Sequence, residues 1–225
     1  MQNTTTLATF CFNQIRQLIL SGELIPGEKL KGEYLKQRLN AGLSPIREAL
    51  SRLGATSFVE FKDNIGFSVS LLSSEKVINA ITTYAKIESL LLKESIECGG
   101  DEWEAGIMGT LYSLAKVEKQ QAKVVYKAWV MRNDEFHNTL VSACKLEGLI
   151  NIRGDCLLVK DWYTVLAHQL NQEELIVTNH TEHAKLAALA IDRKVEQACV
   201  MLYNHIVKGI DPLLERLAKR KLISD

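Results

Sequence analysis

The sequence has little of the cysteine chemistry that marks disulfide-bonded or zinc-thiolate proteins. It contains five cysteines, an odd number, and no Cys-x-x-Cys pair. Widely spaced single cysteines match neither a disulfide framework nor a metal site made of thiolates. We therefore expect buried thiols, because a nucleophilic cysteine would also need a histidine that the fold brings close to it.

The sequence also lacks a long apolar run and an excess of either charge. No apolar stretch reaches the roughly 18 to 20 residues of a membrane span, and the N-terminal residues contain no basic leader. We therefore expect a cytoplasmic protein with no membrane partner. Basic and acidic residues number 27 each, which by itself argues against binding to a polyanion. Residues 1–72 carry a net charge of +2 and the remainder −2, so the asymmetry is mild.

Only three prolines are present, and they help to divide the chain. Pro26, Pro45 and six of the 13 glycines precede residue 70, which indicates short elements early and long helices later. A chain of 225 residues, 47% hydrophobic and 24% charged, is long enough for two ordinary globular domains.

Residues 1–72 have the pattern of a winged helix-turn-helix. Apolar spacing predicts helices over 8–21, 32–39 and 44–53, the last with Ser44 as its N-cap and Pro45 at its first helical position. The runs SFVEFK and GFSVSLL then alternate apolar and polar residues, and DNIG joins them as a hairpin turn that ends on glycine.

Residues 73–225 have a helical period throughout. A long helix opens at Ser73 and ends at Gly99, and further helices are predicted at about 101–119, 123–144, 147–168, 172–190 and 193–209, followed by a short tail helix. No second strand pattern is predicted. The expected fold class is mainly α, with an N-terminal winged helix-turn-helix domain and a C-terminal all-α helical bundle.

Several runs of residues resemble one family. They are ILSGELIPG ending at Gly27, PIREAL at 45–50, GGDEWEA at 99–105, and EFH, EHAKL and NHI in the C-terminal part. The chain thereby resembles the GntR transcription regulators. Its helical remainder resembles the FCD ligand-binding domain of the FadR subfamily, and it is similar to the group of the carbon-starvation-induced regulator. The resemblance extends from about residue 8 to residue 210.

The resemblance implies contacts with double-stranded operator DNA. In a helix-turn-helix the recognition helix enters the major groove by its N-terminal turn, where amides meet phosphate and a forked arginine reads guanine. The expected DNA-binding residues are Ser44, Arg47, Arg52, Asn64 and Gly66. The alternatives are that Ser44 only caps its helix, that Arg47 only pairs with a carboxylate, and that Arg52 is a surface or salt-bridged residue.

Two positions depart from the family pattern. Family members usually have Ser-Arg-Thr-Pro before the recognition helix and often a basic residue at the wing tip. This chain has Leu43 in place of the arginine and Ile65 at the tip, so it lacks two cationic DNA contacts.

Histidines indicate a metal site in the helical part. His137, His183 and His205 lie on three separate predicted helices, and Asn133 precedes His137 by one turn. Such ligands suit zinc, nickel or a similar divalent ion. A single helical histidine is more often a hydrogen-bonded core residue, so spacing alone is a weak signal. The resemblance strengthens it, because metal-binding FCD members have an Asp or Asn at the position of Asn133 and histidines at the other three.

The same resemblance points to an anionic effector. Four neutral ligands would leave the charge of a divalent ion uncompensated, which favours a small carboxylate that completes the coordination. Members often have an arginine four residues before the Glu of the first long helix, where this chain has Tyr84. Arg153 and Tyr163 are the other candidate effector-binding residues. His168 and His180 are expected beside the site or on the surface.

The leading hypothesis is a homodimeric DNA-binding transcription regulator, a repressor in most of the family, controlled by a small carboxylate metabolite. The first alternative is a metal-dependent enzyme of the helical-bundle type, but no HExxH or paired ExxH spacing supports catalysis. The second is a winged helix used for protein contacts. We expect no enzyme activity.

Overall fold

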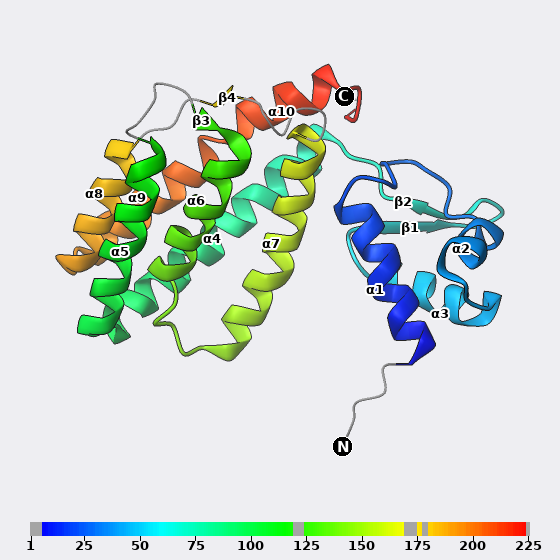
Figure 1. The fold of residues 1–225 in the computed structure, drawn as a ribbon, viewed down its shortest axis with the longest axis horizontal. Helices are drawn as coiled ribbons and strands as arrows, with labels where there is room; N and C mark the ends of the chain where they lie inside the picture. Colours follow the sequence, from blue (N-terminus) through cyan, green and yellow to red (C-terminus); the bar gives the residue numbers. More distant parts are fainter. Residues whose placement is uncertain (1–5, 119–123, 169–174, 177–179, 224–225) are drawn as a thin grey trace. The chain divides into compact units, whose positions relative to one another are not determined.

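The computed structural model describes residues 6–118, 124–168, 175–176 and 180–223. They form two compact units, which are treated separately (Figure 1). Unit 1 comprises Met1–Val77, Leu158–Ala167 and Leu213–Asp225, and unit 2 comprises Ile78–Leu157 and His168–Pro212. The division at residues 72 and 73 stays a prediction, although unit 1 also takes in two segments from later in the chain.

Unit 1 begins with three short helices, α1 (Leu7–Leu20), α2 (Gly32–Leu39) and α3 (Leu43–Leu53). The side chain of Thr6 caps α1, and Asn40 ends α2 in the left-handed conformation at φ 47°. α1 packs against α3 through fully buried aliphatic side chains, among them Ile15, Ile19 and Ile46. The predicted helix-turn-helix is therefore present at nearly the predicted boundaries.

A two-stranded antiparallel hairpin completes the winged helix. Strand β1 (Val59–Lys62) pairs with β2 (Gly66–Val69), so that Val59 faces Val69 and Lys62 faces Gly66. The turn between them needs left-handed backbone at Asn64 (φ 62°) and Gly66 (φ 90°). Asparagine and glycine tolerate that conformation better than other residues, which is why the sequence DNIG turns here.

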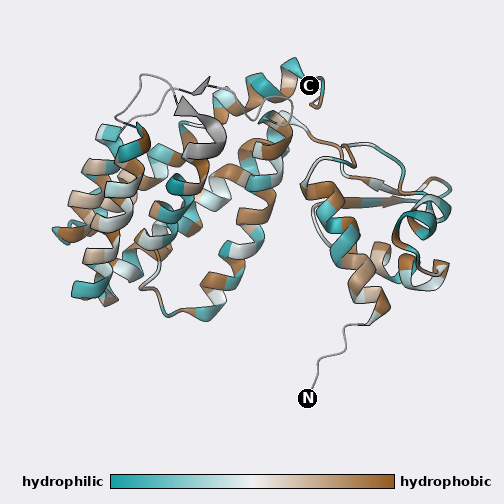
Figure 2. Cartoon of the chain, viewed as in Figure 1, coloured by the Kyte–Doolittle hydropathy of each residue, from teal (hydrophilic) through white to brown (hydrophobic). Residues whose placement is uncertain are grey.

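Unit 2 contains most of the remaining helices, as Figure 1 shows. They are α4 (Ser74–Cys98), α5 (Asp101–Glu118), α6 (Tyr126–Leu140), α7 (Glu147–His168), α8 (His180–Ile191), α9 (Val195–Val207) and α10 (Ile210–Lys219), of which α4, α7 and α10 also belong in part to unit 1. Apolar and polar residues alternate along the helices (Figure 2), and buried apolar side chains of α4, α5, α6, α8 and α9 meet in one core that includes Leu91, Ile107, Phe136 and Leu202.

Arg193, in the turn between α8 and α9, connects this turn to the end of α4 and the start of α5. It has φ 58° and donates hydrogen bonds to the carbonyl oxygens of Ile96 and Gly99 at the end of α4. It also pairs with Glu104 and lies 5.3 Å from the ring centroid of Trp103, both at the start of α5. One side chain therefore supplies donors to carbonyl oxygens that a helix C-terminus leaves unpaired.

Three predictions of local structure are wrong. α3 begins at Leu43 with Gly42 as its N-cap, because the extended backbone at Gly42 starts the helix one residue before Ser44. The all-helical prediction missed the short antiparallel pair β3 (Val124–Val125) and β4 (Leu175–Ile176), since two residues are too few to show a strand period. α6 and α8 consequently begin later than predicted.

No helix among the described residues is both long and apolar enough to cross a membrane.

Candidate nucleic-acid interface and metal centre

The first turn of α3 offers unfilled backbone donors. No side chain caps the helix at Gly42, so its first amides have no acceptor within the helix and suit an anion such as phosphate. Ser44 and Arg47 are exposed on this turn. Arg47 forms no hydrogen bond or ion pair with the part of the chain that the structure describes, which leaves its guanidinium available to a partner.

Arg52, five residues after Arg47 on α3, makes contacts within unit 1. Its Nη1 donates to Oγ1 of Thr9 at 3.1 Å, and its guanidinium lies 4.7 Å from the ring centroid of Phe12. Both partners belong to α1, so Arg52 ties α3 to α1. These contacts favour a structural role for Arg52, and its DNA role stays a prediction.

The two departures from the family pattern have different structural settings. Leu43 is partly buried, and its Cδ2 would lie 3.3 Å from a Cβ at Gly32, so it packs α3 against the start of α2. Ile65 at the wing tip is 54% exposed, beside the exposed Asn64. Lys62 is the nearest cation in sequence, and it pairs with Glu60 at 3.6 Å.

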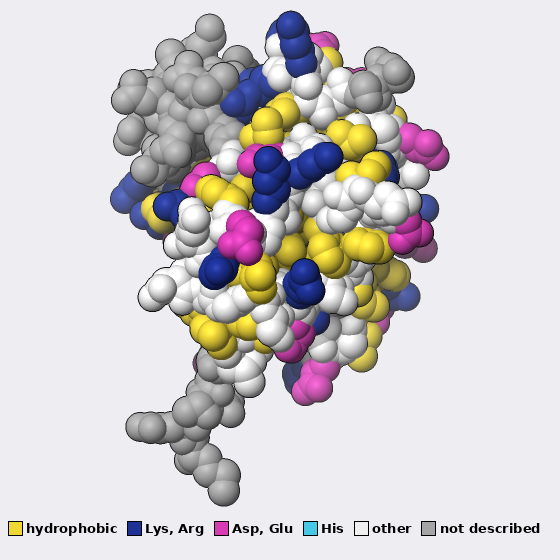
Figure 3. Space-filling view, turned by 90° about the vertical axis from the view of Figure 1, so that its right-hand side faces the viewer, with side chains coloured by type: hydrophobic (Ala, Val, Ile, Leu, Met, Phe, Trp, Pro, Cys, Tyr) yellow, Lys and Arg dark blue, Asp and Glu magenta, His cyan; other side chains and the backbone are white. Residues whose placement is uncertain are grey.

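Figure 3 views the molecule from the side of unit 1. Basic side chains on that face are interspersed with acidic and hydrophobic ones and form no single basic patch. This mixture agrees with the small net charge of the first 72 residues. Local contacts at the helix end and the wing would therefore have to supply more of the affinity than a broad electrostatic field.

Three of the predicted metal ligands converge in unit 2. His137 on α6, His183 on α8 and His205 on α9 each offer a ring nitrogen, and these nitrogens all lie within 4.8 Å of one another. The rings of His137 and His205 stack with centroids 5.2 Å apart, and His183 lies edge-on to His205 at 4.8 Å. Buried Phe136 packs against both His137 and His183. Three helices thus hold the imidazoles against one another.

Two buried atoms in this region have no hydrogen-bond partner among the described residues. They are Nε2 of His183, which is only 2% exposed, and Oδ1 of Asn133. Leaving a buried acceptor unpaired costs about 1–3 kcal/mol, so such atoms call for an explanation. A divalent ion accepts electron pairs from both an imidazole nitrogen and an amide oxygen. The residues present therefore fit a metal centre.

Glu118, the last residue of α5, orients two histidines and an indole. Its carboxylate accepts hydrogen bonds from Nδ1 of His183 at 3.0 Å, Nδ1 of His180 at 3.1 Å and Nε1 of Trp129 at 2.9 Å. Burial alone would raise the pKa of Glu118, but the hydrogen bonds from His183 and Trp129 hold that pKa below its ordinary value. An ionised Glu118 fixes the proton of His183 on Nδ1 and leaves its Nε2 lone pair free.

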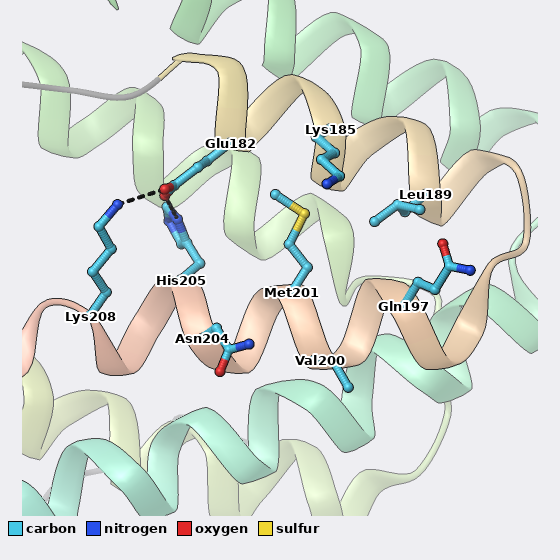
Figure 4. Close-up of a pocket in the computed structure, with 9 residues that line it drawn as sticks. All are labelled: Glu182, Lys185, Leu189, Gln197, Val200, Met201, Asn204, His205 and Lys208. Carbon is cyan, nitrogen blue, oxygen red and sulfur yellow. Dashed lines mark hydrogen bonds and ion pairs between the residues drawn. The ribbon is translucent and has the colours of Figure 1, made fainter.

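Glu182 orients His205 in the same way. Its Oε2 accepts from Nδ1 of His205 at 3.0 Å, and its Oε1 pairs with Lys208 at 2.6 Å (Figure 4). The hydrogen bond from Lys208, together with that from His205, lowers the pKa of Glu182. Burial and the charge of His183 lower the pKa of His205, which keeps its imidazole in the neutral form that binds a metal.

Glu118 and Glu182 change the charge argument made from the sequence. That argument counted four neutral ligands and assigned the compensating negative charge to an effector. The carboxylates of Glu118 and Glu182 bind the Nδ1 atoms of His183 and His205, so the chain itself supplies two negative charges near the site. Charge compensation then no longer argues for a carboxylate effector, and the remaining argument is that a bound metal would have open coordination positions.

The candidate effector-binding residues are placed differently. Tyr84 on α4 is 5% exposed. Arg153 on α7 donates from Nε to Oε1 of Glu88 at 2.6 Å and from Nη2 to Oδ1 of Asn138 at 2.7 Å, so its guanidinium is largely occupied. Tyr163 is buried within unit 1, and burial raises its pKa. The effector role of the three residues therefore stays a prediction.

Sequence reasoning missed Glu118 and Glu182. Glu182 directly precedes His183, and a carboxylate next to a candidate ligand is a signal that could have been followed. Glu118 lies 65 residues before His183, and no spacing rule connects the ends of two helices that far apart. His180 was expected beside the site, and its bond to Glu118 is consistent with that expectation.

Comparison with known proteins finds similarity to bacterial transcription regulators. Residues 7–69 match the family model described as bacterial regulatory proteins, gntR family. The chain is 27% identical over 210 residues to the HTH-type transcriptional repressor GlaR of Escherichia coli strain K12, covering 92% of this chain and 96% of that one. It is 28% identical over 211 residues to the uncharacterized HTH-type transcriptional regulator BphR of Paraburkholderia xenovorans strain LB400, covering 92% and 85%.

Solved structures share the fold. Escherichia coli McbR/YncC superposes with a TM-score of 0.67 at 15% identity, covering 94% of this chain and 98% of that one. A GntR-family regulator from Pseudomonas syringae pv. tomato DC3000 gives a TM-score of 0.58 at 22% identity, covering 96% and 87%. Residues 7–69 therefore match the GntR family of bacterial regulatory proteins, and over most of its length the chain is similar to DNA-binding transcriptional regulators.

Proposed function

We propose that this regulator is a homodimeric repressor whose operator binding responds to a small carboxylate held at a divalent metal centre in unit 2. The observation that carries the metal part is the convergence of His137, His183 and His205 within 4.8 Å, beside the unpaired Oδ1 of Asn133. Repression is supported by the name of one relative, the repressor GlaR.

The metal would be held by Asn133, His137, His183 and His205. When bound, a zinc or nickel ion would supply a Lewis-acidic centre with positions left for water or an effector oxygen. The chain's own contribution is orientation, because Glu118 and Glu182 fix the tautomers of His183 and His205. Buried Phe136 limits the motion of two of the rings.

DNA would be bound by the first turn of α3 and by the wing. The uncapped amides of that turn and Ser44 suit phosphate, and Arg47 can present two donors to the acceptors of one guanine. Asn64 and Gly66, which form the turn of the wing with positive φ, would contact the sugar-phosphate chain. A dimer would present two such surfaces to two half-sites.

Regulation would be a population shift between two arrangements of the dimer. An effector that binds one arrangement better than the other favours it by its differential affinity, and an operator with fixed half-site spacing fits only one. The metal centre lies on α6, α8 and α9, the helices that an effector would draw together or apart.

A use of the winged helix for protein contacts is the remaining alternative, favoured only by the mixed charge in Figure 3. An electrophoretic mobility shift with DNA that flanks the protein's own gene distinguishes this alternative from DNA binding. We expect a retarded complex and a footprint on two half-sites related by a two-fold axis. Absence of any complex across a salt series would contradict DNA recognition, and a footprint on one half-site would contradict the dimer.

The metal is tested by elemental analysis of protein purified without chelator or affinity-resin metal. We expect close to one divalent ion per chain, with occupancy that falls below about pH 6 as imidazoles become protonated. A ratio near zero that does not rise on reconstitution would remove the metal from the proposal. Mobility shifts with a panel of small carboxylates then test the effector.

A further inference from the structure

One face of α5 is exposed and mainly apolar. The helix packs against α6 and α8 through its other faces, and Met108 and Tyr112 remain 54% and 63% exposed. At about 100° of rotation per residue, the exposed positions fall in a band roughly 120° wide. This band, called the α5 stripe below, consists of Asp101, Glu102, Ala105, Met108, Gly109, Tyr112 and Lys116.

The α5 stripe ends in opposite charges. Asp101 lies in the first turn of the helix and Lys116 in the last. Neither forms an ion pair with any residue in the described ranges. Nζ of Lys116 lies 4.6 Å from the ring centroid of Tyr112, so the ammonium is held at the edge of the apolar band.

The α5 stripe is complementary to itself when one copy is reversed. About the point midway between Met108 and Gly109, Asp101 is the counterpart of Lys116 and Ala105 is the counterpart of Tyr112. In an antiparallel pair, the unpaired Asp101 of each copy would meet the unpaired Lys116 of the other, and each large side chain would meet a small residue. Glu102, at the edge of the stripe, has the partly buried Ala115 as its counterpart. A Cβ at Gly109 has nothing within 4 Å in the isolated chain, so the glycine leaves open space rather than making room for a neighbour within its own chain.

We propose that a second copy of this chain docks on the α5 stripe, as an antiparallel α5 pair on a two-fold axis near Gly109. This inference deepens the homodimer of the proposed function and rests on it. An isologous contact repeats every interaction twice, so the axis brings two Asp101–Lys116 pairs and two Ala105–Tyr112 contacts together. The small residues Ala105 and Gly109 allow the two helices to approach closely.

The symmetry of the α5 stripe argues for a second copy over an unrelated partner. An unrelated helix could match the apolar band from either direction and at any register. A two-fold interface requires a surface that is complementary to itself. In the α5 stripe, Asp101 and Lys116 lie equally far from the midpoint, and so do Ala105 and Tyr112. A contact about 16 residues long is modest for a stable dimer, and simultaneous binding of two half-sites would reinforce it.

Charge reversal tests the proposal on the full-length chain without DNA, by sedimentation velocity over a concentration series. K116D places an acid opposite Asp101 in both pairs, and we expect the dimer dissociation constant to rise about tenfold. D101K/K116D reverses both charges and should restore the parent value. K86D, an equal charge change at an exposed position of α4, should have no effect.

A second variant guards against a folding artefact at the helix ends. G109R places two cations at the two-fold axis, yet arginine favours a helix more than glycine does, and circular dichroism should remain that of the parent. We expect this variant to be monomeric at concentrations where the parent is dimeric.

Two outcomes overturn the inference in different ways. If the parent is dimeric and K116D, D101K/K116D and G109R all match it, the α5 stripe is not the interface, while the homodimer stands. If the parent is monomeric both alone and on operator DNA, the homodimer fails as well.

Discussion

The two candidate sites of this regulator differ in how their polar groups are arranged. At the start of α3 the candidate DNA contacts Ser44 and Arg47 are exposed: Arg47 has no partner among the described residues, and the helix start has no cap. At the metal centre the candidate ligands His183 and His205 are held by carboxylates, and the open atoms are buried. The first arrangement suits a partner that arrives with its own charge and shape. The second suits an ion that must find its ligands already oriented.

The largest expected effect comes from removing a buried ligand. His183→Ala should abolish metal retention, because the remaining ligands lose the imidazole that carries the unpaired Nε2. DNA binding by unit 1 should persist, since the core that contains Leu186 and Ala187 beside His183 lies in unit 2. Elemental analysis and a mobility shift on the same preparation measure both. A destabilised bundle from a parent that never held metal would instead identify His183 as an ordinary core histidine.

The second prediction removes orientation and keeps the ligand. Glu118→Gln preserves the shape of the side chain but loses the charge that fixes Nδ1 protonation in His183, and metal affinity should fall about 10- to 100-fold. Competition with a fluorescent chelator measures it. The matched control is Glu135→Gln on α6, whose carboxylate pairs only with Arg132 among the contacts seen and should leave affinity unchanged. Equal affinities for both variants would mean that Glu118 has no part in holding the metal.

The third prediction contrasts two arginines on one helix. Arg47→Ala should lose roughly 1–3 kcal/mol of specific operator binding and little non-specific affinity. Arg52→Ala should instead lose about 1 kcal/mol of the free energy of unfolding, because its contacts to Thr9 and Phe12 are internal. Fluorescence anisotropy on operator and scrambled DNA, with urea titrations, separates the two losses. A change of specificity in Arg52→Ala would place that residue on DNA as well.

The smallest expected effect is the pH dependence of an ion pair beside the wing. Burial would raise the pKa of Glu60, but the hydrogen bond and charge of Lys76 outweigh it, so the folded-state pKa lies below the ordinary value. The pair therefore stabilises the fold above the ordinary glutamate pKa and loses its effect as the pH falls through the folded value. Lys76→Met should cost less than about 1 kcal/mol at pH 7. Urea titrations should show that this difference shrinks as the pH falls below the ordinary glutamate pKa, and a constant difference would assign it to packing.

The sequence predicted the two sites unequally well, because the winged helix depends on residues close together in the chain and the metal centre on residues far apart in it. The hairpin turn at Asn64 and Gly66 and the helices around it follow from neighbours in the chain, so local rules suffice for their positions. The N-cap of α3 was misplaced by two residues, at Ser44 in place of Gly42, because both residues are acceptable caps. His137, His183 and His205 were found through the family pattern, and the structure brings them together. Glu118 was not found, because a buried carboxylate that meets a histidine 65 residues later leaves no local pattern.

The position of Arg193 has a consequence for how unit 2 opens. One guanidinium holds the carbonyls of Ile96 and Gly99, the carboxylate of Glu104 and the ring of Trp103. Any excursion that releases the turn between α8 and α9 must therefore free the end of α4 and the start of α5 at the same moment. These three segments should exchange their amide hydrogens as a single cooperative unit, with one shared opening free energy instead of three graded ones.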